Sequence, residues 1–204
     1  MMSILNTITS DLDWREKEIA NMRLLLLSTE ITATQKKVLL RAAWAMLYAH
    51  YEGFCKNTLT AFYDFVCNSG VHCVKLPETT KLLALEASLK KLRSLPSSNL
   101  LDEIVNFENN NLSVTPEFQE VKSSNLYPNI LIDFLTDADL SIDKVEEHRT
   151  KLKTLVSRRN SIAHGENNFI EGVPYYLTFE SAVYDVIYDL ALQVDSRLTS
   201  PPYI

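Results

Sequence analysis

Apolar side chains recur at spacings of three and four residues along most of the chain, and this periodicity predicts amphipathic helices. A first helix is expected from Leu12 to Glu30, with Arg15 among the charged residues on its polar side. A second helix is expected from Gln35 to about Asn68, with Thr32 or Thr34 as its N-cap. These two helices account for the N-terminal third of the chain.

The second helix differs from the first in its centre. Ala42–Ala49 is apolar on nearly every side. A helix that is apolar all round is buried in a protein interior, because no face of it suits water. We therefore predict that this segment is the central helix of a bundle.

The rest of the chain alternates between apolar periodic segments and polar breaks. Further helices are predicted over residues 78–95, 100–107, 129–135, 141–163 and 178–198. The polar stretch from Asn109 to Ser124 is predicted to be a loop, with a short extended piece near Phe118–Val121. Residues 1–204 are expected to form a single domain, an all-α up-and-down helical bundle with a loop insertion in the middle.

The composition agrees with this fold and narrows the function. Hydrophobic residues make up 46% of the 204 positions, but there are only 4 Gly and 7 Pro, which argues against a loop-rich all-β fold. With 20 Lys+Arg against 26 Asp+Glu, the formal net charge is −6. That balance excludes a histone-like protein that coats nucleic acid, since such proteins neutralise phosphates with a surplus of basic residues.

The cysteines and the apolar stretches bear on the compartment and on cofactors. Cys55, Cys67 and Cys73 are an odd number of cysteines in a chain whose start lacks the features of a signal peptide, which favours reduced thiols and a cytoplasmic location. Every apolar stretch is far shorter than the roughly 20 residues of a membrane-spanning helix, so no membrane association is expected. Cys67, His72 and Cys73 match no paired-ligand spacing, and neither a metal nor another cofactor is predicted.

The candidate chemistry is concentrated at the end of the predicted 141–163 helix. Arg159 falls in the seam traced by Leu155 and Ile162, where the pattern calls for an apolar side chain. Burying an unpaired guanidinium is costly, so Arg159 is expected either to meet a carboxylate inside the bundle or to line a cleft or subunit interface open to an anion. His164 follows five residues later, about 140° around an ideal helix. The two side chains can converge only if the helix ends near His164 or if a second subunit contributes.

Two motifs resemble those of the HEPN superfamily, in particular its small stand-alone prokaryotic members. The first is Arg159-Asn160-Ser161-Ile162-Ala163-His164, which is similar to the signature of an arginine, a polar residue, three further residues and a histidine. The second is Glu52 followed by Lys56-Asn57, which is similar to a pattern found in part of the superfamily. The resemblance implies a HEPN-like helical bundle that forms a homodimer, with two Arg-His pairs facing each other across the two-fold axis.

The resemblance also implies an activity, because many HEPN proteins are metal-independent endoribonucleases of toxin–antitoxin or phage-defence systems. Such an enzyme uses the 2′-hydroxyl of RNA as the nucleophile and leaves 2′,3′-cyclic phosphate and 5′-hydroxyl ends, which requires acid/base groups and positive charge. On this interpretation His164 transfers protons, Arg159 binds the phosphate and Asn160 orients the site. Supporting roles fall to Glu52, Lys56 and Asn57. Glu52 is expected to pair with Lys56 or with Arg159.

A basic stripe leads toward the first motif. The segment from His148 to Arg159 holds five basic residues and no acidic one. Either this is a solvated helix face, or Lys151, Lys153 and Arg158 bind the RNA strand beside the site. The expected partners are the RNA substrate, a second copy of the chain, and an antitoxin or other defence-system protein.

Three other interpretations stay open. In the first, Arg159 and Glu52 form a buried ion pair that fixes the helix register, and His164 is a C-terminal helix cap. In the second, the chain is a non-catalytic helical dimer that binds or regulates a partner such as a nucleotidyltransferase. In the third, Arg159 binds a nucleotide in a regulatory role. His50 and His148 are expected at the surface or at its boundary.

Overall fold

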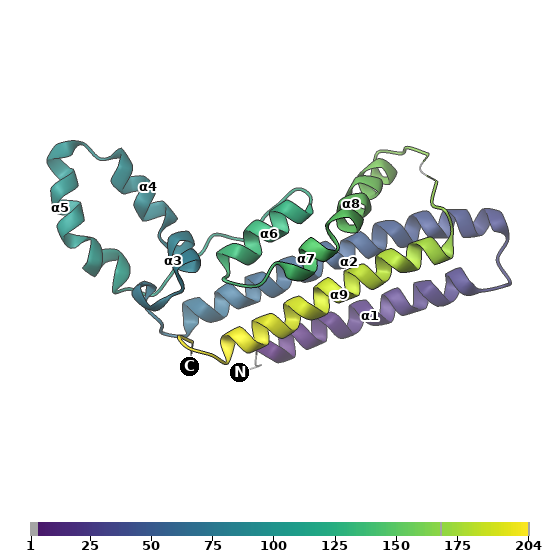
Figure 1. Ribbon diagram of the computed structural model, residues 1–204, viewed down its shortest axis with the longest axis horizontal. Helices are drawn as coiled ribbons and strands as arrows, with labels where there is room; N and C mark the ends of the chain where they lie inside the picture. The colour runs from purple at the N-terminus through teal and green to yellow at the C-terminus, as the bar shows by residue number, and fades with distance from the viewer. Residues whose placement is uncertain (1–3, 168, 204) are drawn as a thin grey trace.

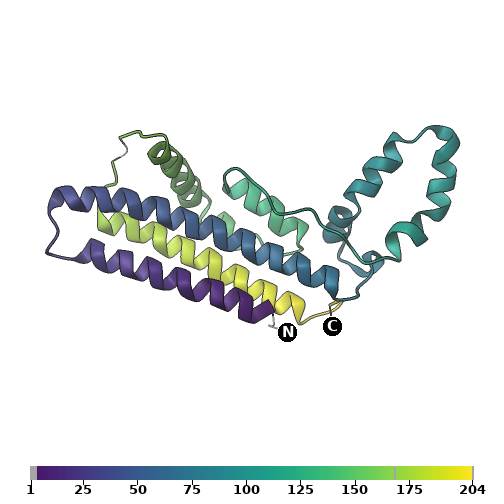
Figure 2. The same ribbon diagram turned by 180° about the vertical axis from the view of Figure 1, so that it is seen from behind.

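Three long helices form the body of the protein. The computed structural model describes residues 4–167 and 169–203. The helices α1 (Ile4–Leu27), α2 (Ala33–Asn68) and α9 (Val173–Leu198) run side by side along the long axis of the molecule (Figures 1 and 2). α2 packs against both of the others, and its buried residues include Trp44, Tyr48 and Phe54. The prediction of a central, buried second helix is confirmed.

The start of α2 is fixed by its N-cap. Thr32 Oγ1 accepts a hydrogen bond from the N–H of Gln35 at 3.2 Å, and the N–H of Thr32 donates to Gln35 Oε1 at 2.8 Å. This capping box satisfies two backbone donors that the first helical turn cannot pair internally. Of the two predicted caps, the structure uses Thr32.

A set of shorter helices covers one side of α2 and α9. These are α6 (Pro128–Asp137), α7 (Asp143–Glu147) and α8 (Arg149–Ala163), which lie over the same side of the long helices (Figures 1 and 2). α8 packs against both α2 and α9. Trp44 Nε1 on α2 donates to the carbonyl oxygen of Leu155 at 3.0 Å, which ties the middle of α8 to the central helix.

The middle of the chain forms an arm that projects from the bundle. It contains α3 (Glu78–Ala84), α4 (Glu86–Ser94) and α5 (Ser97–Phe107), with a 3₁₀ turn (Cys73–Lys75) before them and a π-helical turn (Glu108–Leu112) after them. Neither α4 nor α5 has a buried residue, and both point away from the long helices (Figure 1). The helices of the arm fall within or close to the helices predicted over residues 78–95 and 100–107, and the predicted loop over 109–124 contains the end of the π-helical turn and otherwise no regular secondary structure. The projection of the arm away from the bundle was not predicted.

Several predicted boundaries are wrong. α1 begins at Ile4 and not at the predicted Leu12. The start was missed because polar residues in the first turns hide the apolar periodicity. α9 begins at Val173, where Pro174 fits the first turn since its missing N–H would have no partner there. The predicted 78–95 and 141–163 helices are each broken once, at Leu85 and at His148, where ψ is −1° and 11°.

Other predictions concern the fold class and the histidines. All regular secondary structure in the described residues is helical, which confirms the all-α fold and leaves no strand near residues 118–121. No helix in the described ranges is long and apolar enough to cross a membrane. Both histidines expected at the surface or its boundary are buried. His148 lies with its Nε2 2.9 Å from Asp185 Oδ2, and His50 is buried because its side of α2 faces α1, where its ring meets Trp14 edge-on.

Candidate active site

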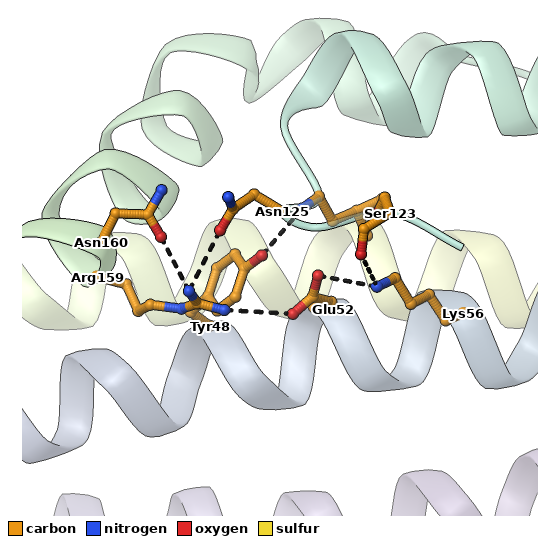
Figure 3. Close-up of polar contacts among 8 residues, drawn as sticks. Tyr48, Glu52, Lys56, Ser123, Asn125, Arg159 and Asn160 are labelled. Atoms are coloured by element: carbon orange, nitrogen blue, oxygen red, sulfur yellow. Dashed lines mark hydrogen bonds and ion pairs between the residues drawn. The ribbon is translucent and has the colours of Figure 1, made fainter. Parts of the chain in front are cut away.

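One face of α2 carries three polar side chains at intervals of about one helical turn. Tyr48, Glu52 and Lys56 are spaced four residues apart, so they lie in a row below α8 and the segment that precedes α6 (Figure 3). Lys56 Nζ donates to Glu52 Oε1 at 3.0 Å. The pairing of Glu52 with Lys56 leaves the other carboxylate oxygen for a second partner.

α8 brings Arg159 onto this row. Its Nη2 donates to Glu52 Oε2 at 3.4 Å, and its guanidinium carbon lies 4.0 Å from the centre of the Tyr48 ring. An arginine stacked on an aromatic ring and paired with a carboxylate is stabilised by both contacts. The Arg159 side chain is nevertheless 26% exposed. It meets a carboxylate, as one expectation had it, and it also stays open to solvent.

Two amide side chains complete the surroundings of Arg159. Nη1 donates to Asn160 Oδ1 at 2.9 Å and to Asn125 Oδ1 at 3.2 Å (Figure 3). Asn160 is the neighbour of Arg159 in α8, whereas Asn125 comes from the segment before α6. The guanidinium is therefore held by groups from three separate parts of the chain.

Residues 123–126, which we call the strap, are fixed to α2 on both sides of Asn125. Lys56 Nζ donates to the carbonyl oxygen of Ser123 at 2.8 Å. The N–H of Leu126 donates to Tyr48 Oη at 2.9 Å. These contacts set the position of Asn125 without any help from regular secondary structure in the strap itself.

The Tyr48 hydroxyl is a positioning group. The pKa of Tyr48 is raised to about 12, first because burial disfavours the phenolate and then because Glu52 lies close, although the hydrogen bond from Leu126 and the charge of Arg159 act in the opposite direction. The phenol therefore stays protonated near neutral pH. It supports Arg159 through its ring and the strap through its oxygen.

His164 stands apart from this network. α8 ends at Ala163, His164 is the C-cap, and Gly165 takes a φ of 79°, so the predicted end of the helix is confirmed. The His164 side chain is exposed and makes no hydrogen bond, ion pair or ring contact with the described residues. Within one chain, Arg159 and His164 are not brought into contact.

Two of the three predicted RNA-binding residues line one hollow beside α8. Lys153 and Arg158 line a surface hollow of about 540 Å³. The Arg158 guanidinium lies 5.3 Å from the ring centre of Trp44 and 5.0 Å from that of Tyr175. Lys151 does not line this hollow.

Asn57 does not join the Arg159 network. Its Nδ2 donates to Asp11 Oδ2 on α1 at 3.4 Å. Five residues after Glu52, Asn57 is rotated by about 140° around α2 and faces the opposite seam. Asn57 therefore lies apart from the side chains it was predicted to support.

Sequence reasoning missed the strap. Ser123 falls inside the predicted loop and Asn125 just beyond it, in a polar run that ends at the proline that opens α6. An asparagine shortly before a helix marks a turn, but nothing in a single sequence pairs it with a residue 34 positions away. Cys55, Cys67 and Cys73 are free, and no group of three or more His, Cys, Asp or Glu in the described ranges could hold a metal.

The chain as a whole is similar to one known family. Residues 4–203 match the family described as MAE_28990-like HEPN, and this range contains both motifs and every residue of the Arg159 network. No curated protein and no solved structure matches the chain significantly. The family match extends over nearly all of the helical bundle. The protein therefore belongs to the MAE_28990-like HEPN family.

Proposed function

We propose that this HEPN protein is a metal-independent endoribonuclease whose active site forms between two copies of the chain. The observation that carries the proposal is the state of Arg159, which is oriented by Glu52 and Tyr48 and is still 26% exposed. Lys56 balances the charge of Glu52, so the positive charge of Arg159 is left for a ligand. A planar, permanently charged guanidinium suits the oxygens of a phosphodiester.

The reaction needs few protein groups, because RNA carries its own nucleophile. The 2′-hydroxyl loses its proton and attacks the adjacent phosphorus, and the 5′-oxygen leaves with a proton. The products are a 2′,3′-cyclic phosphate and a 5′-hydroxyl. Imidazole groups suit both proton transfers, which assigns this role to His164. Arg159 offsets the charge that develops on the non-bridging oxygens of the phosphate.

The separation of Arg159 from His164 supports a composite site. In one chain the guanidinium is engaged with α2 and the strap, while the exposed imidazole at the end of α8 has no described partner. A two-fold dimer would bring two imidazoles and two guanidiniums to one phosphate, so that one imidazole can accept the proton of the 2′-hydroxyl while the other donates a proton to the 5′-oxygen. The hollow beside Lys153 and Arg158 would then carry the RNA strand toward the site.

A ribonuclease that acts on the cell's own RNA must be restrained. We therefore place the protein in a toxin–antitoxin or phage-defence system, with an antitoxin or another defence protein as its controlling partner. The substrate sequence is set by contacts outside the Arg159 network, since phosphate contacts alone carry no sequence information.

The direct test compares wild-type protein with His164→Ala on tRNA and mRNA in the presence of EDTA. We expect wild-type protein to leave 2′,3′-cyclic phosphate ends and His164→Ala to leave the RNA intact. His72→Ala is the matched control, because His72 is also an exposed histidine but lies in the turn before α3. Neither side chain packs in the core, so both variants should have the same melting temperature as wild-type protein. Intact RNA with wild-type protein, across tRNA and mRNA, would overturn the proposal.

A second function is favoured by one observation. Arg159 already has four partners in its own chain, which is also the environment of an arginine that only fixes the packing of α8 on α2. The protein would then be a non-catalytic HEPN dimer that binds or regulates a partner such as a nucleotidyltransferase. Wild-type protein that leaves RNA intact but co-purifies with such an enzyme would establish this alternative.

A further inference from the structure

The two amides beside Arg159 have a fixed orientation. A guanidinium offers only donors, so an amide next to it must turn its oxygen, and not its nitrogen, toward the cation. Asn125 and Asn160 both do so, and both oxygens accept from the same atom, Nη1 of Arg159. Their Nδ2 atoms consequently point away from the guanidinium. Figure 3 shows both nitrogens on the side of Arg159 that is turned away from α2.

These nitrogens are free donors at an accessible place. Neither Nδ2 atom has a hydrogen-bond partner among the described residues, and both side chains are only half-buried. Each NH₂ group can donate two hydrogen bonds. Two such groups beside an arginine form a surface that presents donors and positive charge, and a tetrahedral oxyanion accepts from groups of this kind.

The negative charge nearby does not oppose such a ligand. Glu52 accepts from the other guanidinium nitrogen, Nη2, on the α2 side, and the carboxylate of Glu52 also pairs with Lys56. In Figure 3 Glu52 lies beside the guanidinium along α2, whereas both amide nitrogens lie farther from α2. An anion seated on the amides therefore meets the guanidinium and the amide donors on the side away from α2.

We propose that Asn125 and Asn160 form a phosphate seat, in which their Nδ2 groups donate to the non-bridging oxygens of the phosphodiester that Arg159 binds. The inference rests on the proposed function and adds to it a binding residue from outside both HEPN motifs. Asn125 is held on either side by the anchored strap, through Ser123 and Leu126. A donor fixed in this way loses little conformational entropy when the ligand binds.

The test compares two substitutions of Asn125 that separate its two roles. Asn125→Asp keeps an oxygen that accepts from Arg159 but replaces the donor with a negative charge, whereas Asn125→Ala removes both groups. If Asn125 only holds Arg159, Asn125→Asp equals or exceeds Asn125→Ala in activity. If Asn125 faces the phosphate, Asn125→Asp is the worse of the two.

The control for charge is Ser124→Asp, which adds a negative charge to an exposed neighbour in the strap. On a defined RNA we expect kcat/KM to fall about tenfold in Asn125→Ala and at least about hundredfold in Asn125→Asp. Ser124→Asp should lower kcat/KM by less than about threefold, because an exposed charge is screened. Equal activity of Asn125→Asp and wild-type protein would overturn the proposal.

Binding of a 2′-O-methyl RNA oligonucleotide separates this proposal from the ribonuclease proposal. This probe cannot be cleaved, so its Kd is informative even if the protein has no nuclease activity. A Kd that rises most in Asn125→Asp, less in Asn125→Ala and least in Ser124→Asp supports the phosphate seat. An unchanged Kd in both Asn125 variants contradicts it. If the variants fail to fold, the side-chain NH₂ signals of Asn125 and Asn160 in ¹⁵N-labelled wild-type protein are followed during titration with the oligonucleotide. They shift if the seat binds phosphate and stay unchanged if it does not.

Discussion

Two arginines pack against α2 on different sides, and their surroundings can be compared contact by contact. Arg15 of α1 donates through Nε to Asp11 Oδ2 at 3.0 Å and through Nη1 to the carbonyl oxygen of His50 at 3.4 Å. Arg159 of α8 pairs with Glu52 at 3.4 Å. Each guanidinium also lies over an aromatic ring, Trp14 at 4.5 Å for Arg15 and Tyr48 at 4.0 Å for Arg159.

Arg15 lies in the seam between α1 and α2, and Arg159 lies in the seam between α2 and α8. The two seams differ in how far solvent reaches the guanidinium. The Arg15 side chain is 6% exposed, against 26% for Arg159. The partners of Arg15 belong to α1 and α2 alone, whereas Arg159 is also held by an amide of the strap. A paired, ring-stacked arginine is therefore not by itself evidence of a ligand site. Remaining exposure and free donors beside the cation distinguish the α2–α8 seam from the α1–α2 seam.

The largest effect is expected from Arg15→Ala. The change removes the cation that pairs with Asp11, so this largely buried carboxylate loses its charged partner and keeps only Trp14 and Asn57 as donors among the described residues. We expect the free energy of unfolding to fall by about 3–5 kcal/mol. Urea unfolding followed by circular dichroism measures it. Lys17→Ala, on the same helix but exposed, is the control and should change the free energy by less than about 0.5 kcal/mol. A loss of similar size in both variants would show that Arg15 has no special role in the seam.

The next effect concerns activity and uses the same substitution in both seams. Arg159→Lys keeps the charge but loses the planar fork, so we expect RNA cleavage to fall at least about hundredfold while the free energy of unfolding changes by less than about 1 kcal/mol. Arg15→Lys should show the reverse, with lower stability but normal cleavage per folded molecule. Cleavage rates and urea unfolding of both variants form the test, and the comparison fails if both lose the same property.

The sequence predicts α2 well because its signals are local. The Thr32 cap and the apolar centre of α2 are properties of neighbouring residues, and they place this helix correctly. The helices of the arm are also predicted, over residues 78–95 and 100–107, but their place outside the bundle is not. α4 and α5 bury no residue, so their apolar periodicity does not report a core. The breaks at Leu85 and His148 carry neither Gly nor Pro, and only tertiary packing selects them.

In the candidate site, too, residues with a local sequence signal are predicted and residues placed by tertiary packing are missed. Arg159 is predicted from a charge in an apolar seam, and Glu52 and Lys56 from their resemblance to a HEPN motif together with their spacing of four residues. The structure brings all three together. Asn125 is missed because its contact with Arg159 spans 34 positions. Arg15 was expected on a polar face, yet it is buried, because the chain makes room for it at Gly53, a contact that no pattern within α1 reveals.

A smaller effect is expected at Gly53, the residue of α2 beside Arg15. Alanine is favoured over glycine in a helix by about 1 kcal/mol, so Gly53→Ala would ordinarily stabilise. Here the added Cβ would lie 2.9 Å from Nη1 and 3.0 Å from Nη2 of Arg15. The guanidinium is buried and held by its hydrogen bonds, so it cannot move away from the added Cβ. We therefore expect a net loss of about 1 kcal/mol in the free energy of unfolding.

A double-mutant cycle identifies the cause of that loss. In the Arg15→Met background the guanidinium is absent, and Gly53→Ala should become neutral or stabilising. Both backgrounds are measured by urea unfolding. If Gly53→Ala costs the same with and without the guanidinium, the glycine is needed for some reason other than Arg15.

The smallest effect is a pH dependence of stability that belongs to the α1–α2 seam. Burial lowers the pKa of His50 below its ordinary value of 6.5, and Arg15 lowers it too, although Glu18 and Asp11 act in the opposite direction. Between the pKa of His50 in the folded chain and its pKa in the unfolded chain, the unfolded chain binds more protons than the folded chain. The His50 contribution to stability is therefore complete above pH 6.5 and is lost as the pH falls below it.

Urea unfolding at pH 7.5 and pH 5.5 measures this effect. The two free energies of unfolding should differ by under about 1 kcal/mol, and the difference should be reduced in His50→Gln and unchanged in His72→Gln, whose imidazole is exposed. An equal difference in wild-type protein and His50→Gln would place the titrating group elsewhere. The comparison of the two seams would then rest on access to solvent alone.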